Sequence, residues 1–425
     1  MEDHIILGGG IAGLSLAYFL NDRSIILEKE KQSGGLCRSY SISGVSYDMG
    51  PHIMFSKNKE ILDFHRSLVD CNQIKRSNKI YFDGKFIKYP FENGIGRLSK
   101  TNREYCLTSF LNNAYENYDP TNMLQFFLKT FGEGITNLYL RPYNEKIWKY
   151  DPAFMDTQMV ERIPKPPKSD IIKSANGIET EGYKHQLFFY YPKQGGFQSL
   201  INAYKERIKE KSKVINSVKI KSISSQKGDW KITTNKGTLK TKNLTNCMPL
   251  HELFKYLKAP VKIQKYVNQL KYNSMLVIAL HVKKDNLGKN FAVYIPNKDI
   301  IFHRISKLNF LGANYKPSGG GSVLLAEITF NSGVSLNETK AVRKVIDDLL
   351  KLKFITKKED ILEINTHFIK YAYVIYDLNH FKNTDTILSY LQNKGINSVG
   401  RFAEFRYMNS DEVAARSKRL AKKLN

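Results

Sequence analysis

The chain has 425 residues, of which 42% are hydrophobic and 12% aromatic, and its formal net charge at pH 7 is +26. This length is too great for one compact core, so we expect two or three structural units, and the composition is that of a folded globular protein. No apolar run reaches the ~18 to 20 residues of a membrane-spanning helix. The start, Met1-Glu2-Asp3, does not show the basic region and apolar core of a signal peptide.

The four cysteines have neither metal-binding nor redox-motif spacing: Cys37, Cys71, Cys106 and Cys247. We expect free thiols in a reducing compartment, the cytoplasm, and no metal site.

The large positive charge comes from lysines that are spread along the chain, without an arginine-rich block or a nucleic-acid-binding motif. We therefore expect no nucleic-acid partner and no membrane insertion. The charge indicates either a solvated lysine-rich surface or a positive field that attracts an anionic small molecule.

The first thirty residues have the pattern of a dinucleotide-binding unit. The apolar run His4 to Leu7 predicts a buried strand, and the spacing predicts a helix over Ile11 to Leu20. A second strand, Ser24 to Leu27, ends at Glu28, whose carboxylate would accept the ribose hydroxyls and so argues against a 2′-phosphate. Around the first helix start, three glycines fit G-x-G-x-x-G, which allows a tight turn, close approach to a pyrophosphate and helix–strand contact: Gly8, Gly10 and Gly13.

A second glycine pair indicates which dinucleotide binds. Gly34-Gly35 follows Glu28 by six residues and leads through Leu36 to Arg38. Large FAD enzymes carry such a pair because the extended cofactor passes a second tight loop, whereas NAD-binding domains rarely do. We predict FAD, with Gly35 and Arg38 in its site; a plain turn after the strand is the alternative.

The remaining elements predict an interrupted fold. A hairpin is expected at Lys79–Phe82 and Lys85–Tyr89 around Asp83-Gly84, and helical spacing runs from about 98 to 160. The expected strands after that region are 213–225, 230–235, 243–248, 275–282, 291–295, 300–305, 322–330 and 361–370, and the expected helices are 198–210, 336–352, 384–393 and 410–424.

Two segments combine residue types that suit a functional site. Gly50-Pro51 breaks the chain and would present His52 from a loop, although a lone histidine is more often structural. The segment Arg141 to Trp148 places two cations, two aromatic rings and an amide side chain within eight residues.

Together these segments resemble the UDP-galactopyranose mutase family, in particular its eukaryotic-type branch within the flavin amine oxidase-like superfamily. The resemblance extends over almost the whole chain. Its most specific parts are Arg141-Pro142-Tyr143-Asn144 and the pair Tyr294-Ile295-Pro296 and Phe302-His303-Arg304. The other matching parts are Met49 to Ser56, which resembles the family's histidine loop against the flavin, Tyr371-Ala372-Tyr373, and Gly400-Arg401-Phe402 to Arg406-Tyr407.

The resemblance implies a set of site residues. It implies catalytic roles for His52, Arg141 and Arg304, the two arginines binding the substrate diphosphate. It adds Arg401 and Asp411 to the FAD-binding residues. The implied substrate-binding residues are Tyr89, Phe91, Glu92, Asn144, Trp148, Tyr294, Tyr373 and Tyr407.

Two segments depart from the family pattern. In Tyr89-Pro90-Phe91-Glu92-Asn93, the segment similar to the uridine-contacting one, Glu92 replaces an expected glutamine. A carboxylate only accepts hydrogen bonds whereas an amide also donates, which leaves the nucleobase and the sugar open. The family's Gly-Asn-Gln-Asp run after the last tyrosine reads Met408-Asn409-Ser410-Asp411 here.

The resemblance implies an FAD-dependent isomerase, an intramolecular transferase that interconverts pyranose and furanose forms of a UDP-sugar for cell-surface polysaccharide biosynthesis. Reduced flavin N5 would be the nucleophile at the anomeric carbon, so FAD would act in its reduced form. An FAD-dependent oxidase or dehydrogenase of the same superfamily is the alternative, and a protein that keeps FAD as a structural or sensing ligand is a third. The substrate would be UDP-galactose or a related nucleotide sugar, and a homo-oligomer is compatible with the sequence.

The expected fold class is α/β, with a sequence-discontinuous FAD-binding Rossmann-type domain, a helical insertion and an antiparallel-sheet substrate domain. We assign 1–68, 197–260 and 394–425 to the FAD-binding domain and 96–160 to the helical domain. The sheet domain takes 69–95, 161–196 and 268–383.

Overall fold

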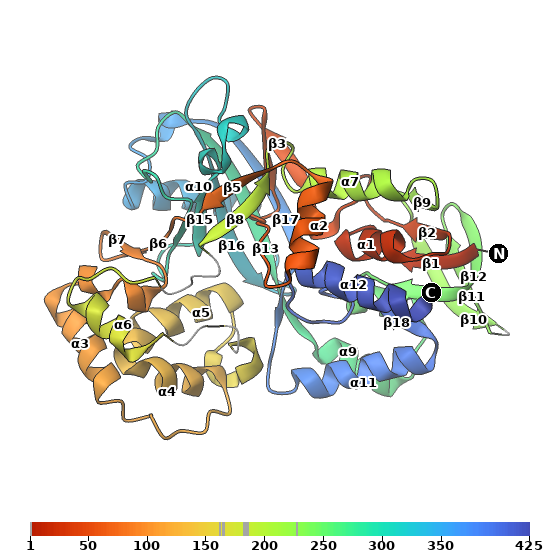
Figure 1. Cartoon of the computed structure of the whole chain (residues 1–425), viewed down its shortest axis with the longest axis horizontal. Coiled ribbons are helices and arrows are strands. Elements are labelled where there is room, and N and C mark those ends of the chain that lie inside the picture. Colours follow the sequence, from red (N-terminus) through yellow and green to blue (C-terminus); the bar gives the residue numbers. More distant parts are fainter. Residues whose placement is uncertain (1, 161–162, 164–165, 182–186, 227) are drawn as a thin grey trace.

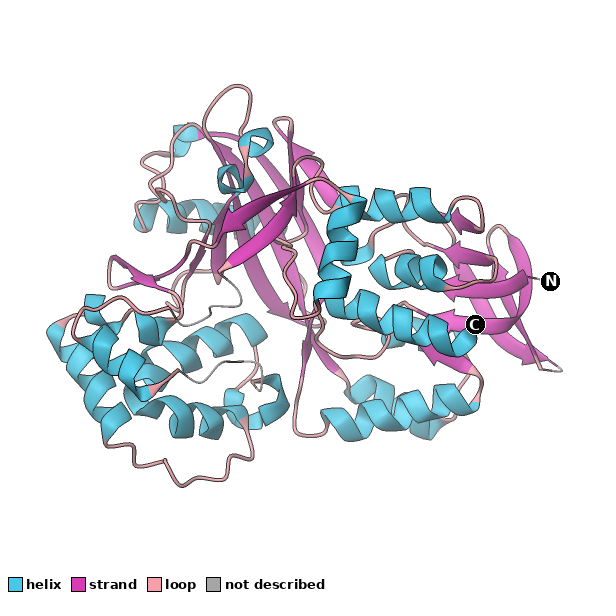
Figure 2. Cartoon of the chain, viewed as in Figure 1, coloured by secondary structure: helices cyan, strands magenta, loops and turns pink. Residues whose placement is uncertain are grey.

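The computed structural model describes residues 2–160, 163, 166–181, 187–226 and 228–425. Three groups of elements are visible in Figure 1: a layered α/β unit that holds both termini, a long central sheet, and a group of helices beside that sheet. Figure 2 shows the same division by secondary structure, with strands concentrated in the first two groups. Among the described residues, we find no helix with the length and apolar character needed to cross a bilayer.

The α/β unit is built on a mixed sheet that contains the first strand of the chain. The path of hydrogen-bonded strands is β10 (Ile220–Gln226), β11 (Asp229–Thr234), β12 (Gly237–Asn246), β1 (Glu2–Leu7), β2 (Ser24–Leu27) and β9 (Ser212–Ile215), and β18 (Ile396–Ser398) also pairs with β12. Strands β12, β1, β2, β9 and β18 are parallel, and β10 to β12 form an antiparallel extension. The segment expected as one strand, 213–225, is therefore two strands, β9 and β10, at opposite edges of the sheet.

Alternate residues of these strands pack on different helices, as the period of two requires. Ile6 and Ile26 share a core with α1 (Ile11–Phe19), α7 (Gln198–Ile208) and α12 (Ser410–Leu424), against which α2 (Lys59–Leu68) also lies. Ile5 and Leu244 belong to the core that contains α8 (Leu250–Tyr256), α9 (Val261–Gln269) and α11 (His380–Asn393). The expected domain boundary at 383 falls inside α11, and that helix packs on β18 because its apolar side matches this face of the sheet.

The central sheet has the order β17 (Ile361–Ile375), β13 (Lys271–Val282), β16 (Ser322–Asn331), β15 (Arg304–Lys307), β14 (Ala292–Tyr294), β6 (Asn78–Phe82) and β7 (Lys85–Lys88). All neighbours are antiparallel except β14 and β6. Even-numbered residues of β13 and β16 face the core that includes α10 (Glu338–Lys351), and odd-numbered apolar residues face the core of the α/β unit. Residues 300–303, expected in a strand, precede β15, since the Ile301 amide donates to the Asp348 carboxylate of α10 instead of to a neighbouring strand.

Two short strand pairs and a helical group complete the fold. The pairs are β3 (Ser39–Ile42) with β4 (Val45–Asp48), and β5 (Cys71–Lys75) with β8 (Phe188–Pro192). The helical group contains α3 (Lys100–Leu111), α4 (Met123–Ile135), α5 (Arg141–Trp148) and α6 (Lys168–Ala175), and a π-helical segment, Thr136–Leu140, joins α4 to α5. Helix α6 lies in the segment expected with the sheet, but it packs on α3 because its buried side, Ile171 and Ala175, belongs to the helical core.

We expect Gly13→Ala to destabilise the α/β unit strongly. A Cβ at this position would lie 2.1 Å from the Gly8 carbonyl oxygen, a backbone atom that cannot move without breaking the β1–α1 turn. The free energy of unfolding should fall by at least the ~1 to 3 kcal/mol of an overpacked core, measured by thermal and denaturant melts. Gly319→Ala is the control, because a Cβ there meets no atom within 4 Å; equal melting of the two variants would contradict this packing.

Candidate functional site

The loops that follow β1 and β2 form a cradle suited to a dinucleotide. Gly8 has a φ of +110°, and a Cβ on Gly35 would lie 3.3 Å from the Gly10 Cα, so the two glycine loops approach closely. The Gly34 amide donates to the Gly9 carbonyl oxygen over 2.8 Å. Helix α1 begins here with no side-chain cap and no acidic residue in its first turn, which leaves its amides for a phosphate.

Glu28 lies beside this cradle because β1 and β2 are parallel and in register at Leu7 and Leu27. Its carboxylate is 7% exposed and accepts hydrogen bonds from the amides of Gly9, at 2.8 Å, and Glu30, at 2.9 Å. Two carboxylate oxygens offer about four acceptor positions, so acceptor capacity remains for ribose hydroxyls. The residues present thus fit the adenosine end of a dinucleotide.

The other expected cofactor residues surround the same loops. Arg38 Nε donates to the Gly35 carbonyl oxygen at 3.0 Å, and Arg401 Nε donates to the Met408 carbonyl oxygen at 2.8 Å. A Cβ on Gly400 would lie 2.9 Å from the Ala12 Cβ, so the segment after β18 touches the first turn of α1. Asp411, in the first turn of α12, accepts a hydrogen bond from the Ser56 hydroxyl.

His52 follows β4 on a loop whose conformation depends on a buried carboxylate. Asp48 is 1% exposed and accepts from the Ser39 hydroxyl at 2.6 Å, the Tyr191 hydroxyl at 2.9 Å and the Phe197 amide at 2.9 Å. These donors come from β3, β8 and the start of α7, so one side chain ties three segments to the loop. Burial raises the pKa of Asp48 to about 6, although its hydrogen bonds oppose the shift.

The His52 ring is neutral at physiological pH. Burial, and next the charge of Arg401, lower its pKa to about 3. Its Nδ1 is buried without a hydrogen-bond partner among the described residues, and lies 4.0 Å from an Asp48 oxygen. A neutral ring with a free nitrogen can exchange one hydrogen bond with a bound group without introducing a charge.

Arg304 is held by a carboxylate that the sequence did not indicate. Glu327 is 0% exposed, and its oxygens accept from Arg304 Nε at 2.9 Å and from Nη2 at 2.7 Å. The two residues are direct partners in the β15–β16 register. The charge of Glu327 holds the pKa of Arg304 above its usual value in spite of burial. Gly50 of the histidine loop is close: a Cβ on this glycine would lie 3.8 Å from Glu327 Oε2.

Aromatic side chains surround this arginine. Tyr294 is opposite Arg304 in the β14–β15 register, and its ring centroid lies 4.9 Å from that of Tyr89 and 5.6 Å from that of Tyr143. Tyr143 comes from α5, so the helical group and the central sheet both contribute to this wall. The negative faces of the rings suit the guanidinium cation, and the tyrosine hydroxyls can donate hydrogen bonds to a phosphate ligand.

A second aromatic group joins α5 to the C-terminal segment. The rings of Tyr373 and Tyr407 are stacked at 5.9 Å, and the Trp148 ring lies 5.6 Å from Tyr373 and 6.1 Å from Tyr407. The Arg401 guanidinium lies 4.8 Å from the centroid of the Tyr407 ring. The structure therefore brings together these four expected residues, which are far apart in the sequence.

Two expected residues of α5 make only local contacts. The Arg141 side chain is 44% exposed, and its Nε donates to Glu145 at 2.8 Å. Asn144 accepts from the Trp148 indole at 2.7 Å and donates to the Leu140 carbonyl oxygen at 2.7 Å. Among the described residues, no hydrogen bond or ion pair joins Arg141 to Arg304 or to its partner Glu327, although both arginines belong to segments that meet at Tyr143.

Lys146 fixes α5 to the central sheet. Lys146 is 6% exposed, and its ammonium donates to the carbonyl oxygens of Ile295 at 2.9 Å and Asn297 at 2.8 Å. The Thr329 hydroxyl donates in turn to the backbone carbonyl oxygen of Lys146. Burial lowers the pKa of Lys146 to about 7. This contact fixes the position of Tyr143 and Trp148 relative to β14.

Glu92 and Phe91 lie in a buried turn after β7. Phe91 stacks on Tyr139 at 4.9 Å, and Glu92 is 3% exposed. Burial raises the pKa of Glu92 to about 7, and no cation pairs with it among the described residues. Near neutral pH this group is therefore present both as the protonated carboxyl, which can donate a hydrogen bond, and as the carboxylate, which only accepts.

Sequence reasoning missed Glu327, Asp48, Tyr143 and Lys146 as individual site residues. Only Tyr143 and Lys146 had a local signal, since they lie within the aromatic and cationic segment of α5. Glu327 and Asp48 are single acids in strands, and their partners are set by strand register and tertiary packing. In the part of the chain that is described, no cluster of side chains with metal-ligand character is found.

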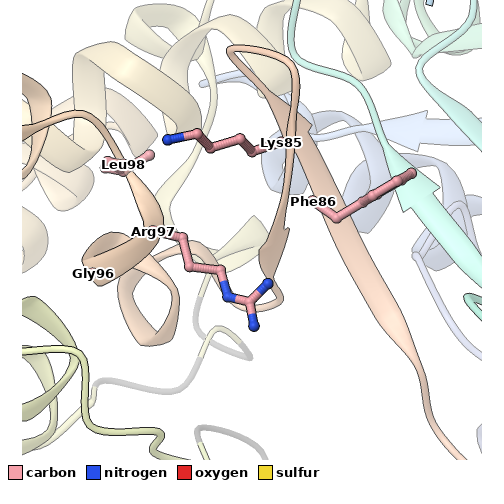
Figure 3. A pocket seen from close by; sticks show the side chains of 5 residues that line it. All are labelled: Lys85, Phe86, Gly96, Arg97 and Leu98. Atoms are coloured by element: carbon pink, nitrogen blue, oxygen red, sulfur yellow. The ribbon is translucent and has the colours of Figure 1, made fainter. Parts of the chain in front are cut away.

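One surface pocket is separate from these residues. It has a volume of about 550 Å³ and is lined by Lys85, Phe86, Gly96, Arg97 and Leu98. Figure 3 shows the Phe86 side chain directed away from Lys85 and Arg97. None of the expected site residues lines it, so we do not assign the site to this pocket.

Comparison with known proteins supports the dinucleotide cradle. Residues 6–68 match the family described as an NAD(P)-binding Rossmann-like domain. The chain is 25% identical over 182 residues to UDP-galactopyranose mutase of Mycoplasma pneumoniae, which covers 38% of this chain and 44% of the relative. It is 43% identical over 53 residues to carotenoid 3,4-desaturase of Haloarcula japonica, covering 12% of this chain and 11% of the relative. The chain thus spans less than half the length of these curated relatives.

We expect the buried Asp48 carboxyl to make stability depend on pH. Its pKa is about 6 in the folded state against 3.8 for an ordinary carboxyl, so the folded state disfavours the ionised form. The resulting penalty is absent below pH 3.8, grows between the two values and is complete above 6, reaching about 3 kcal/mol at most. Asp48→Asn should remove this dependence, so the stability of wild type relative to the variant should fall between pH 4 and 7. Denaturant titrations at a series of pH values measure both stabilities. If the stabilities of wild type and Asp48→Asn changed equally with pH between 4 and 7, the assignment would be contradicted.

Solved structures define the architecture more completely. The crystal structure of reduced UDP-galactopyranose mutase has a TM-score of 0.91 and 24% sequence identity, covering 100% of this chain and 94% of that one. An oxidoreductase from Methanosarcina mazei has a TM-score of 0.70 and 13% identity, covering 99% of this chain and 100% of that one. The mixed α/β fold with a Rossmann-like unit is thereby confirmed. The chain has the fold of UDP-galactopyranose mutase.

Proposed function

We propose that the protein is an FAD-dependent mutase that interconverts the pyranose and furanose forms of a UDP-sugar. The observation that carries the proposal is the Arg304 guanidinium, fixed by Glu327 and surrounded by Tyr143, Tyr294 and Tyr373. A mutase must hold a diphosphate that leaves and returns. A preorganised cation with tyrosine hydroxyls suits that charge.

The cofactor proposal is supported by the glycine cradle, the Glu28 carboxylate and the family match of residues 6–68. In its reduced form, bound FAD would supply the nucleophile for the anomeric carbon. Glu28 would accept the ribose hydroxyls, the amides of α1 would hold the phosphates, and the loop at His52 would adjoin the flavin without adding charge.

The chain's own residues would act mainly by positioning. Arg304 and Arg141 would neutralise the diphosphate, and the hydroxyls of Tyr373 and Tyr407 would donate to its oxygens. The pKa of Tyr373 is raised by burial, so its hydroxyl keeps its proton and stays a donor at neutral pH. The aromatic wall would exclude water from the sugar while the diphosphate is detached.

Arg304→Lys should weaken binding of UDP more than tenfold while the flavin absorbance stays unchanged. Lysine keeps the charge beside Glu327 but lacks the planar fork that binds a carboxylate and a phosphate together, and tenfold is about 1.4 kcal/mol. Calorimetric titration with UDP provides the measurement. Arg419→Ala, which removes an exposed arginine, is the matched control and should bind UDP as wild type does. Normal UDP binding by the Arg304 variant would place the diphosphate elsewhere.

Glu92→Gln should improve UDP binding and make it independent of pH between 6 and 8. The carboxyl has a raised pKa of about 7, so above that pH it is ionised and repels a uracil carbonyl, while below it the neutral form can donate. Wild-type affinity should therefore fall as pH rises through 7. Equal affinities of both proteins for UDP, CDP and GDP across this range would show that Glu92 does not contact the base.

The redox state separates the proposed mutase from the alternative, an FAD-dependent oxidase or dehydrogenase. A mutase consumes no electrons, so turnover of UDP-galactose should be near zero with oxidised enzyme and should begin after dithionite reduction. The reaction should then continue for many turnovers per electron pair under anaerobic conditions. Chromatography of the product measures this turnover. Bleaching of the oxidised flavin by substrate, with one acceptor consumed per product, would overturn the mutase proposal.

A further inference from the structure

A small pocket behind the tyrosine wall contains an arginine, Arg76, that has no anionic partner among the described residues. The pocket has a volume of about 200 Å³, and its lining includes Arg76, Asn78, Lys79, Lys88 and Tyr89. Arg76 lies just after β5, where its amide donates to the Leu187 carbonyl oxygen at 2.7 Å. Its position is therefore fixed by the backbone.

Two nitrogens of the Arg76 guanidinium are buried but unsatisfied. Nε and Nη2 are both buried and have no hydrogen-bond partner within the described part of the chain, and the buried Asn78 Oδ1 also has none. A buried donor without a partner costs free energy, about 1 to 3 kcal/mol for a neutral group and more for a charged one. Such groups in a pocket call for a partner, which a bound ligand can supply.

The acids in the pocket are engaged with other cations. Glu181 pairs with Lys88 at 3.0 Å, and Glu179 and Glu181 both raise the pKa of Lys79, which burial and Arg97 lower overall. The described part of the lining has four cations, Lys75, Arg76, Lys79 and Lys88, and two carboxylates, Glu179 and Glu181. An excess of positive charge therefore remains at Arg76.

The pocket adjoins the tyrosine side chains around Arg304. Tyr89, which lines it, contacts Tyr294 at 4.9 Å between ring centroids, and Asn78 Nδ2 donates to the Tyr294 hydroxyl at 3.2 Å. On its other side the Arg76 guanidinium lies 5.3 Å from the ring centroid of Phe55, in the loop that begins at His52. Arg76 is thus placed between the loop proposed to adjoin the flavin and the wall around Arg304.

We propose that Arg76 binds a carboxylate carried by the sugar, so that the substrate is a nucleotide-linked uronic acid. The inference rests on the proposed function, in which Arg304 and Arg141 take the diphosphate. A second anionic group is then needed to satisfy Arg76, and the planar guanidinium matches a carboxylate through two parallel hydrogen bonds. Asn78 Oδ1 accepts from a neighbouring sugar hydroxyl.

The test compares UDP, UDP-galactose and UDP-galacturonic acid by calorimetric titration of the flavin-loaded full chain. Wild type should bind UDP-galacturonic acid at least tenfold more tightly than UDP-galactose. Arg76→Ala should reduce this ratio to near one, and Arg76→Lys should keep part of it. Lys57→Ala, which removes an exposed lysine, is the control and should leave the ratio unchanged.

The outcomes separate this inference from the proposed function. If wild type binds UDP but shows no preference for the acidic sugar, or if the preference survives in Arg76→Ala, the inference is overturned while the diphosphate site stands. A changed flavin spectrum or lost flavin in Arg76→Ala, with no change in the ratio, would assign the guanidinium to the cofactor and also overturn it. Failure of UDP itself to bind wild type would overturn the proposed function and this inference together.

Discussion

The buried ion pair between Arg304 and Glu327 is the constraint on which the rest of the site depends. A carboxylate with no exposed surface is strongly destabilising unless a cation pairs with it in good geometry, and removal of either partner leaves an uncompensated charge. The pair forms because β15 and β16 place the two residues opposite each other. The position of the Arg304 side chain therefore depends directly on the strand register of the central sheet.

Contacts on either side of this pair hold the three groups of elements together. On β16, Glu327 lies near Gly50 of the histidine loop, and Thr329, on the same face, donates to the Lys146 carbonyl oxygen of α5. Lys146 in turn donates to the segment after β14. A short stretch of one strand thus sets the distance between the dinucleotide cradle, the arginine and the aromatic side chains of the helical group.

Charge is distributed unevenly within this arrangement. Arg304 has a bidentate carboxylate partner, the exposed Arg141 pairs with Glu145, and Arg76 has no carboxylate partner among the described residues. The environment also keeps His52 neutral and leaves Glu92 close to its titration point at neutral pH. The site is therefore arranged for anions, since Arg76, Arg401 and Lys146 have no carboxylate partner within the described part of the chain.

The sequence by itself determined the elements whose physical cause is local. Glycine spacing, an apolar strand and Glu28 twenty residues after Gly8 predicted the cradle, because parallel strands in register bring these residues to one sheet edge. Resemblance to a family supplied Arg304, Tyr294 and Tyr373, whose segments are distinctive. Only the tertiary structure decided which acid holds Arg304, which segments Asp48 joins, that α11 packs on the α/β unit, and that Arg76 lacks a partner. These depend on strand pairing and burial between residues far apart in the chain, for which the spacing within one segment carries no information.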